Sequence, residues 1–512
     1  MRTFGPAAAA GDGYYAASVP SPSVAAVRSG PEDHSWVVLG VCSLSMLIVG
    51  IDTTIVNVAL PSIDRDLHAS LAGLQWIVDA YTLVLGSFLM LGGSTADRLG
   101  RRRVFQTGLF TFVFGSALCA AAPSLGVLIA ARAFQALGGA MLNPVALSIV
   151  RNVFHDPRER ARAVGVWSGV FGVSLGLGPA VGGILVTTAG WRYVFLVNVP
   201  VGLLAVLLTA AYVPESRAEH PRRLDPIGQL LVILGLASVT FAIIEGQSYG
   251  WTSATILALF AVAAAAFVAL VPYELRCDQP LVEVRFFRSI PFSGAAVSAV
   301  CAFAAYGAFL FLNTIYLQDA RGFSALRAGL FTLPLAVSTM VFAPVTGRVI
   351  AAVGARRPLL VAAPAIGLGA VLMTGLTPDT PVWLLLVAYV IFGSGLGLVN
   401  PPITNTAISG MPPAQAGVAG AIAASSRQVG TTVGIALVGA IVSANGTTLG
   451  PRFAAASHPG WWMMVALAVA LLAVTAITTT PRALASARAT AARLAPGSGP
   501  HLIDDLPTYP RQ

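Results

Sequence analysis

The chain contains about fourteen stretches of roughly 20 mainly apolar residues, the length that an α-helix needs to cross a bilayer. Because 56% of the 512 residues are hydrophobic and only 10% are charged, no water-soluble globule could bury them all. We therefore expect an all-α integral membrane protein. The expected spans cover residues 36–60, 72–93, 104–122, 126–150, 163–188, 193–213, 226–245, 252–272, 290–316, 328–347, 358–376, 382–408, 417–443 and 461–479.

Arginine placement tests the order of these spans, because cytoplasmic loops of membrane proteins hold the excess of positive charge. With the N-terminus inside, about 23 arginines fall on the cytoplasmic side and about 5 on the other. One missed span would invert every later loop. We therefore expect a multi-pass protein of the cell (plasma) membrane with both termini in the cytoplasm.

A sequence repeat divides the expected helices into two halves. "AGLQW" at residue 72 recurs as "AGLFT" at residue 328, and Gly93 and Gly100 have counterparts in Gly347 and Gly354. Parallel halves are typical of transporters with a substrate site between them. The sequence predicts fourteen transmembrane helices as 6 + 2 + 6. The predicted domains are a disordered cytoplasmic tail (1–35), a six-helix half (36–213), a linker with an inserted helix pair (214–289), a second half (290–480) and a disordered cytoplasmic tail (481–512).

Other classes of protein lack their signals here. The formal charge of +9 is scattered between apolar runs, which argues against nucleic-acid binding. The four cysteines show no C-x-x-C spacing and the six histidines no H-E-x-x-H, so we expect no metal site. A phosphate-binding G-x-x-x-x-G-K-[ST] is impossible without lysine, and no G-x-S-x-G occurs. We expect no cofactor and no enzymatic activity.

Four stretches together resemble a known family. They read "IDTTIVNVALP" (51–61), "GGSTADRLGRRRV" (92–104), "ARAFQALGGA" (131–140) and "GVSLGLGPAVGG" (172–183). These resemble motifs of the major facilitator superfamily, and the first of them, with "WRYVFLVNVPVG" (191–202), resembles its fourteen-span drug:proton antiporter branch. The resemblance extends from about residue 36 to 480 and implies a multidrug efflux permease driven by a proton gradient.

The loop between the second and third spans combines glycines, one acid and several arginines. The glycines permit a tight turn, and the arginines would face the anionic inner leaflet. A role as a topology anchor alone would explain the arginines. The resemblance implies a conformational latch, although Ala351 replaces its acid in the second half. The latch residues are Gly93, Asp97, Arg98, Gly100, Arg101 and Arg102.

The fifth span carries glycines at small-xxx-small intervals, which leave a flat face for close helix packing. Tight packing is one interpretation of this pattern. The resemblance implies a more specific role, in which an antiporter helix seals against the other half without a proton leak. The residues concerned are Gly172, Gly176, Gly178, Pro179, Gly182 and Gly183.

Charges inside the spans are functional candidates because they are costly there. Asp52, Asp79 and Arg132 are each expected about 9 to 12 Å deep and so in one layer. The arginine could hold one carboxylate ionised, while the other, desolvated, could exchange protons near neutral pH. Alternatively, Asp79 lies in the outer interface beside Trp76 and Tyr81. The resemblance matches Asp52 and Arg132 to residues implicated in proton transfer, and Ala136 departs from the family's usual glycine.

Polar residues elsewhere in the spans are candidates for lining a substrate cavity or for hydrogen bonds between helices. Arg427 would bind an anionic group or pair with an acid of the first half. The other candidates are Asn57, Gln135, Asn143, Asn198, Asn400 and Asn405.

The predicted function is proton-coupled export of an amphiphilic or cationic drug-like molecule, by a monomer in the lipid bilayer. Two alternatives stay open. One is a carrier of the same fold that takes up or exports a specific metabolite. The other is a polytopic membrane enzyme or sensor, although the short loops and scattered histidines do not favour it.

Overall fold

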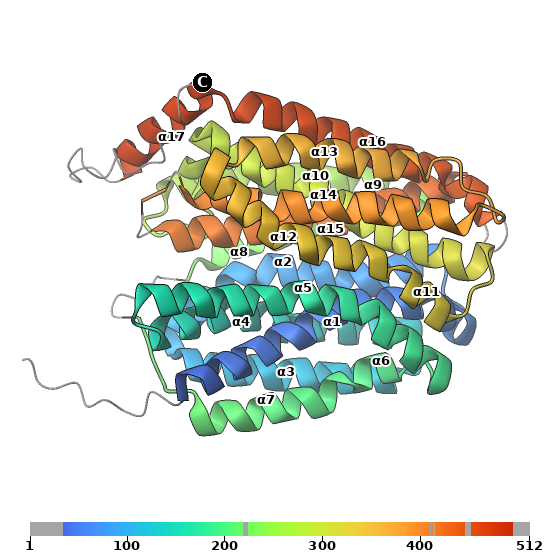
Figure 1. Ribbon diagram of the computed structural model, residues 1–512, viewed down its shortest axis with the longest axis horizontal. Coiled ribbons are helices and arrows are strands. Elements are labelled where there is room, and N and C mark those ends of the chain that lie inside the picture. The colour runs from blue at the N-terminus through green and yellow to red at the C-terminus, as the bar shows by residue number, and fades with distance from the viewer. Residues whose placement is uncertain (1–33, 219–223, 410, 413–414, 446–451, 495–512) are drawn as a thin grey trace, which may run out of the picture.

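The structure is a computed structural model that describes residues 34–218, 224–409, 411–412, 415–445 and 452–494. Long helices run side by side along one axis of the molecule (Figure 1). Within these residues, thirteen helical segments are long and apolar enough to cross a membrane. The expectation of an all-α membrane protein is therefore confirmed. The tail expected at residues 1–35 lies almost wholly outside the described residues.

In chain order, α1 to α7 are called the first half, α8 and α9 the inserted pair, and the helices from α10 to α16 the second half. The first half contains α1 (Ser35–Leu67), α2 (Leu71–Leu99), α3 (Arg101–Ala121), α4 (Leu125–Val153), α5 (Pro157–Thr188), α6 (Tyr193–Leu196) and α7 (Asn198–Tyr212). The inserted pair is α8 (Pro226–Tyr249) and α9 (Ala254–Arg276), followed by the 3-10 helix η2 (Val284–Arg288). The second half contains α10 (Ile290–Ile315), the π-helix η3 (Tyr316–Ala320), α11 (Ala325–Phe331), α12 (Leu333–Val353), α13 (Arg356–Val371), α14 (Val382–Ser409), α15 (Ala416–Ala444) and α16 (Phe453–Thr478).

One expected span differs in length. The stretch 358–376 becomes α13, which ends at Val371 after 16 residues and is followed by a turn. It is therefore not among the thirteen candidate spans. Helix α13 nevertheless packs between α14 and α16 inside the second half.

The expectation of a disordered tail from residue 481 is wrong for its first part. Helix α17 (Pro481–Leu494) begins where the Thr480 hydroxyl accepts a hydrogen bond from the Ala483 amide at 3.3 Å. Ala483 and Ala487, one turn apart, are buried, whereas the arginines of the helix are exposed. The amphipathic pattern of small residues and arginines thus folds against the bundle. Residues 495–512 lie outside the described part.

The start of α1 and helix α17 lie at the same end of the bundle, on the left of Figure 1. At that end α2 and α12 stop at the two glycines of the sequence repeat. Gly100 has φ of 111° and Gly354 has φ of 79°, a conformation that a side chain disfavours. The repeat therefore encodes the same helix ending in both halves.

The halves meet along two seams. On one, α2 packs against α15, and the inserted α8 contacts both of these helices. On the other, α5 packs against α11 and α12. Figure 1 shows α5 and α12 in front, with α8 and α9 behind.

Candidate functional site

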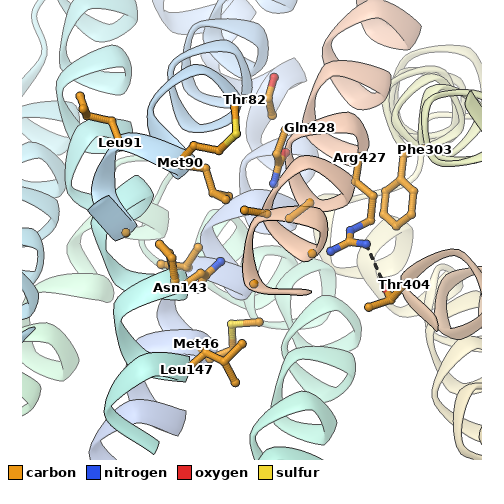
Figure 2. Close-up of a pocket in the computed structure, with 18 of the residues that line it drawn as sticks. Met46, Thr82, Met90, Leu91, Asn143, Leu147, Phe303, Thr404, Arg427 and Gln428 are labelled. Atoms are coloured by element: carbon orange, nitrogen blue, oxygen red, sulfur yellow. Dashed lines mark hydrogen bonds between the residues drawn. The ribbon is translucent and has the colours of Figure 1, made fainter. Parts of the chain in front are cut away.

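A cavity of about 680 Å³ lies between the two halves. Helices α1, α2, α4 and α5 contribute lining residues from the first half, and α10, α14 and α15 from the second. The cavity extends to Asp97, Arg151 and Asp225, which lie at the end of the bundle where α1 begins. Apolar side chains such as Met46 and Leu147 alternate with polar ones such as Asn143 (Figure 2).

The opposite end of the bundle is closed by contacts between the halves. The Gln75 side chain of α2 donates to the backbone oxygens of Ile435 and Ala436 on α15, at 2.8 and 3.0 Å. Near the same end, Gln318 donates to the Val58 oxygen at 2.9 Å. Among the described residues, the cavity lining reaches the end of the bundle where α1 begins and these contacts close the other end, as expected of one state of an alternating-access carrier.

Four of the predicted cavity residues line this space: Asn57, Asn143, Asn400 and Arg427. Three others do not. Gln135 and Asn198 are buried within the first half, and Asn405 is exposed on the surface of α14. Their positions around the helix axis turn them away from the cavity.

Arg427 of α15 points into the cavity beside α14 and α10 (Figure 2). Its Nη1 donates to the Thr404 hydroxyl at 3.2 Å, and the guanidinium carbon lies 5.9 Å from the centre of the Phe303 ring. Within the described residues, Arg427 makes no ion pair, so the expected pairing with an acid of the first half is absent.

Asp52 and Arg132 form a fully buried ion pair inside the first half. Arg132 Nη1 lies 2.6 Å from Asp52 Oδ2, and the two side chains are 1% and 0% exposed. The other carboxyl oxygen accepts from Gln135 at 2.8 Å and from Asn198 at 2.9 Å. Because each charge is hydrogen-bonded as well as paired, the cost of burying it is offset. The Arg132 guanidinium also lies 4.1 Å from the centre of the Tyr81 ring.

Asp79 does not join this pair. It is fully buried, and among the described residues neither carboxyl oxygen has a hydrogen-bond partner. It lies on the same face of α2 as Gln75 and Thr82, which contact α15; the hydroxyls of Thr82 and Thr432 are 2.7 Å apart. The structure therefore places Asp79 on the seam between the halves and Asp52 within one half.

The glycines of α5 serve two different contacts. A Cβ on Gly182 would lie 2.8 Å from Ile55 of α1, and Gly178 also faces α1. A Cβ on Gly183 would lie 2.7 Å from the Ala325 oxygen of α11, and Gly176 faces Ala336 of α12.

The proline of this run takes part in the contact between halves, since the Pro179 oxygen lies against Gly329 of α11. Gly172, in contrast, has nothing within 4 Å of such a Cβ. The glycine and proline run therefore packs α5 against α1 of its own half and against α11 and α12 of the other half. Gly172, its first glycine, takes no part in these contacts.

The loop after α2 is held by its own acid, by the end of α7 and by the segment that follows α7. Arg101 lies 3.1 Å from Asp97 Oδ1. The Arg102 side chain donates to the Ala210 oxygen at 2.5 Å, and its amide donates to Glu215 at 3.2 Å. Gly93 lies beside Pro144 of α4, and Arg98 is exposed.

Several partners in these networks escaped the sequence analysis. Glu215 crowds Gly100, where a Cβ would meet its carboxylate at 2.5 Å. Ser116 accepts from Gln135 at 2.7 Å beneath the ion pair. Gln75 forms the hydrogen bonds that close one end of the cavity. In the sequence, these residues stand out only as polar residues in or beside apolar helices, and no motif marks them.

Comparison with known proteins agrees with this architecture. The family model described as Major Facilitator Superfamily matches residues 42–435. The chain is 37% identical to the multidrug resistance protein Stp of Mycobacterium tuberculosis (strain CDC 1551 / Oshkosh), covering 78% of this chain and 74% of that protein. It is 35% identical to the puromycin resistance protein of Streptomyces alboniger, covering 89% and 93%.

Among solved structures, a POT family peptide transporter in an auto-inhibited form is similar in fold. Its TM-score is 0.65 at 15% identity, over 88% of this chain and 98% of that one. Sequence motifs, family model and fold therefore agree: the chain belongs to the major facilitator superfamily.

Proposed function

We propose that this protein exports drug-like or antibiotic small molecules from the cell by proton-coupled antiport. The observation that carries the proposal is the cavity between the halves, which is accessible at one end and closed at the other. The names of the relatives, a multidrug resistance protein and a puromycin resistance protein, support export of such compounds.

The number of spans and the placement of arginines give the membrane topology. We take α13 as the fourteenth span, which gives an even number of crossings and places α1's start and α17 on one side. The excess of arginine on that side assigns it to the cytoplasm. The cavity then faces the cytoplasm, the state in which an exporter binds its substrate.

Proton coupling is assigned to the two buried acids in different roles. Asp79 lies on the seam of α2 with α15, where deprotonation would leave an unpaired charge between helices that move apart. Asp52, held by Arg132, keeps α1 and α4 together within one half. The load and release of a proton at Asp79 is thereby linked to opening of the seam.

Everted membrane vesicles with an acidic interior test the direction of transport. A panel of antibiotics that includes puromycin is added, and the internal pH is followed with a fluorescent dye. Antiport predicts drug uptake into the vesicles together with drug-dependent loss of internal acid. An uncoupler should abolish both, and so should Asp79→Asn with the protein still folded. Drug movement in the same direction as protons, or unaffected by the uncoupler, would contradict the proposal.

A further inference from the structure

Within the described residues, Arg427 is the one charged side chain that lines the cavity away from its accessible end. The other charged lining residues, Asp97, Arg151 and Asp225, all lie near that end within the described part of the chain. The buried acids Asp52 and Asp79 are not lining residues. The inner part of the cavity is therefore positively charged.

The guanidinium of Arg427 has unused hydrogen-bonding capacity. Of its five N–H donors, one binds the Thr404 hydroxyl, and no carboxylate of the described residues forms an ion pair with it. Arg132, by comparison, binds Asp52, Gln135 and a backbone oxygen. A cation inside a membrane protein is expected to face a partner. The N–H donors of Arg427 that have no partner within the described residues face the cavity.

Aromatic and amide groups surround this cation. Phe303 and Tyr306 of α10 lie one turn apart, with ring centres 6.2 Å apart, and both line the cavity. Asn400, one turn before Thr404 on α14, also lines the cavity, and its side-chain oxygen has no partner among the described residues. The site thus offers a fixed cation, an amide and two aromatic faces to one ligand.

We propose that Arg427 binds an anionic oxygen of an aromatic substrate, a carboxylate or an acidic phenolate, whose rings contact Phe303 and Tyr306. This inference rests on the proposed export function and names its substrate class. The sequence predicted an amphiphilic or cationic substrate; of these the cationic one is disfavoured, because within the described residues a cation in the inner cavity would meet Arg427 and no acid. Guanidinium and carboxylate groups match in a bidentate geometry, which gives the site its selectivity.

The test uses the full-length protein purified into nanodiscs of zwitterionic lipid, without any gradient. Three probes share one ring system and differ in charge: anthraquinone-2-carboxylate, its uncharged carboxamide and 2-aminomethylanthraquinone. Calorimetric titration at low salt should show the carboxylate bound about 10- to 100-fold tighter than the carboxamide, the range for a hydrogen bond to a charged group. The amine should bind most weakly.

Arg427→Gln should abolish the preference for the carboxylate and change carboxamide binding less than about threefold. Arg427→Lys should keep part of the preference, since the charge remains. A wild-type protein that fails to bind the carboxylate, binds it no tighter than the carboxamide, or prefers the amine would overturn the inference without any variant. A preference retained in Arg427→Gln would do so too. Because no gradient is present, these outcomes are separate from failure of proton-coupled export in vesicles.

Discussion

The two halves of this protein treat a buried arginine in opposite ways. In the first half Arg132 is fully enclosed and paired with Asp52, and no part of it lines the cavity. In the second half Arg427 is partly exposed, binds one hydroxyl and faces the cavity. In the first half, each charge has an oppositely charged partner within the same half. In the second half, the guanidinium of Arg427 faces any ligand that enters the cavity. The comparison shows that partners, rather than depth, separate a structural charge from one that can recognise a ligand.

The largest effect should come from removing the enclosed arginine. Arg132→Leu leaves the Asp52 carboxylate buried without its cation, which should lower the free energy of unfolding by about 3–5 kcal/mol. The matched change Arg427→Leu removes one hydrogen bond and should cost about 1 kcal/mol. Unfolding in mixed micelles, followed by circular dichroism, compares the two. Equal losses would remove the distinction drawn between the halves.

Asp79 tests whether the unpaired acid on the seam couples transport to protons. Asp79→Asn should fold normally but lose the driving force of one proton, about 2.3 kcal/mol per 100 mV. Accumulation of drug in everted vesicles should then collapse toward equilibrium. Exchange of labelled for unlabelled drug without a gradient serves as the control and should persist. Accumulation at the wild-type level would exclude Asp79 from coupling.

The seam between α5 and α11 can be probed with a matched pair of glycines. Gly183→Val places a side chain against the Ala325 backbone and should cost about 1–3 kcal/mol or force the seam apart. Gly172→Val has open space and should stay within about 0.5 kcal/mol of the wild type. Proton leak through proteoliposomes measures whether the seal is lost. A leak from both variants would argue against a local seal.

The smallest effect on stability is expected at the loop after α2. In the ion pair of Asp97 with Arg101, the side chains are 33% and 17% exposed, respectively. Exposed pairs of this kind contribute about 0–1 kcal/mol to the free energy of unfolding. Asp97→Asn should therefore leave the unfolding free energy almost unchanged while slowing transport. The second-half variant Ala351→Asp provides the counterpart, since that half lacks the acid. A transport rate unchanged in Asp97→Asn would reduce this loop to a topology anchor.

Much of the helical architecture was predictable because nearly every span is a long apolar run. The sequence placed Asp52, Asp79 and Arg132 at one depth and predicted that the arginine pairs with one of the two carboxylates; in the structure its partner is Asp52. The family resemblance is confirmed by the match over residues 42–435. The repeat correctly indicated that Gly100 and Gly354 end equivalent helices.

The errors share a physical origin, which is that depth in the membrane does not fix direction around a helix axis. Asp79 lies on the face of α2 that meets α15 rather than beside Asp52 and Arg132, and Asn405 points to the surface. Hydrogen-bond partners such as Glu215 come from another segment of the chain, so local pattern could not identify them. Helix α17 was missed because its apolar side consists of alanines, which carry little hydropathy signal.

The inserted pair gives the two flanks of the transporter different access from the lipid. Gln229 of α8 donates to the Ser87 oxygen at 2.9 Å, and Trp76 of α2 donates to Glu245 of α8 at 2.9 Å, so α8 is fastened along α2 where it meets α15. The flank of α5 and α12 lies on the other side of the molecule (Figure 1). A lipophilic compound dissolved in the inner leaflet would therefore meet α8 on the flank of α2 and α15 before it could reach the cavity.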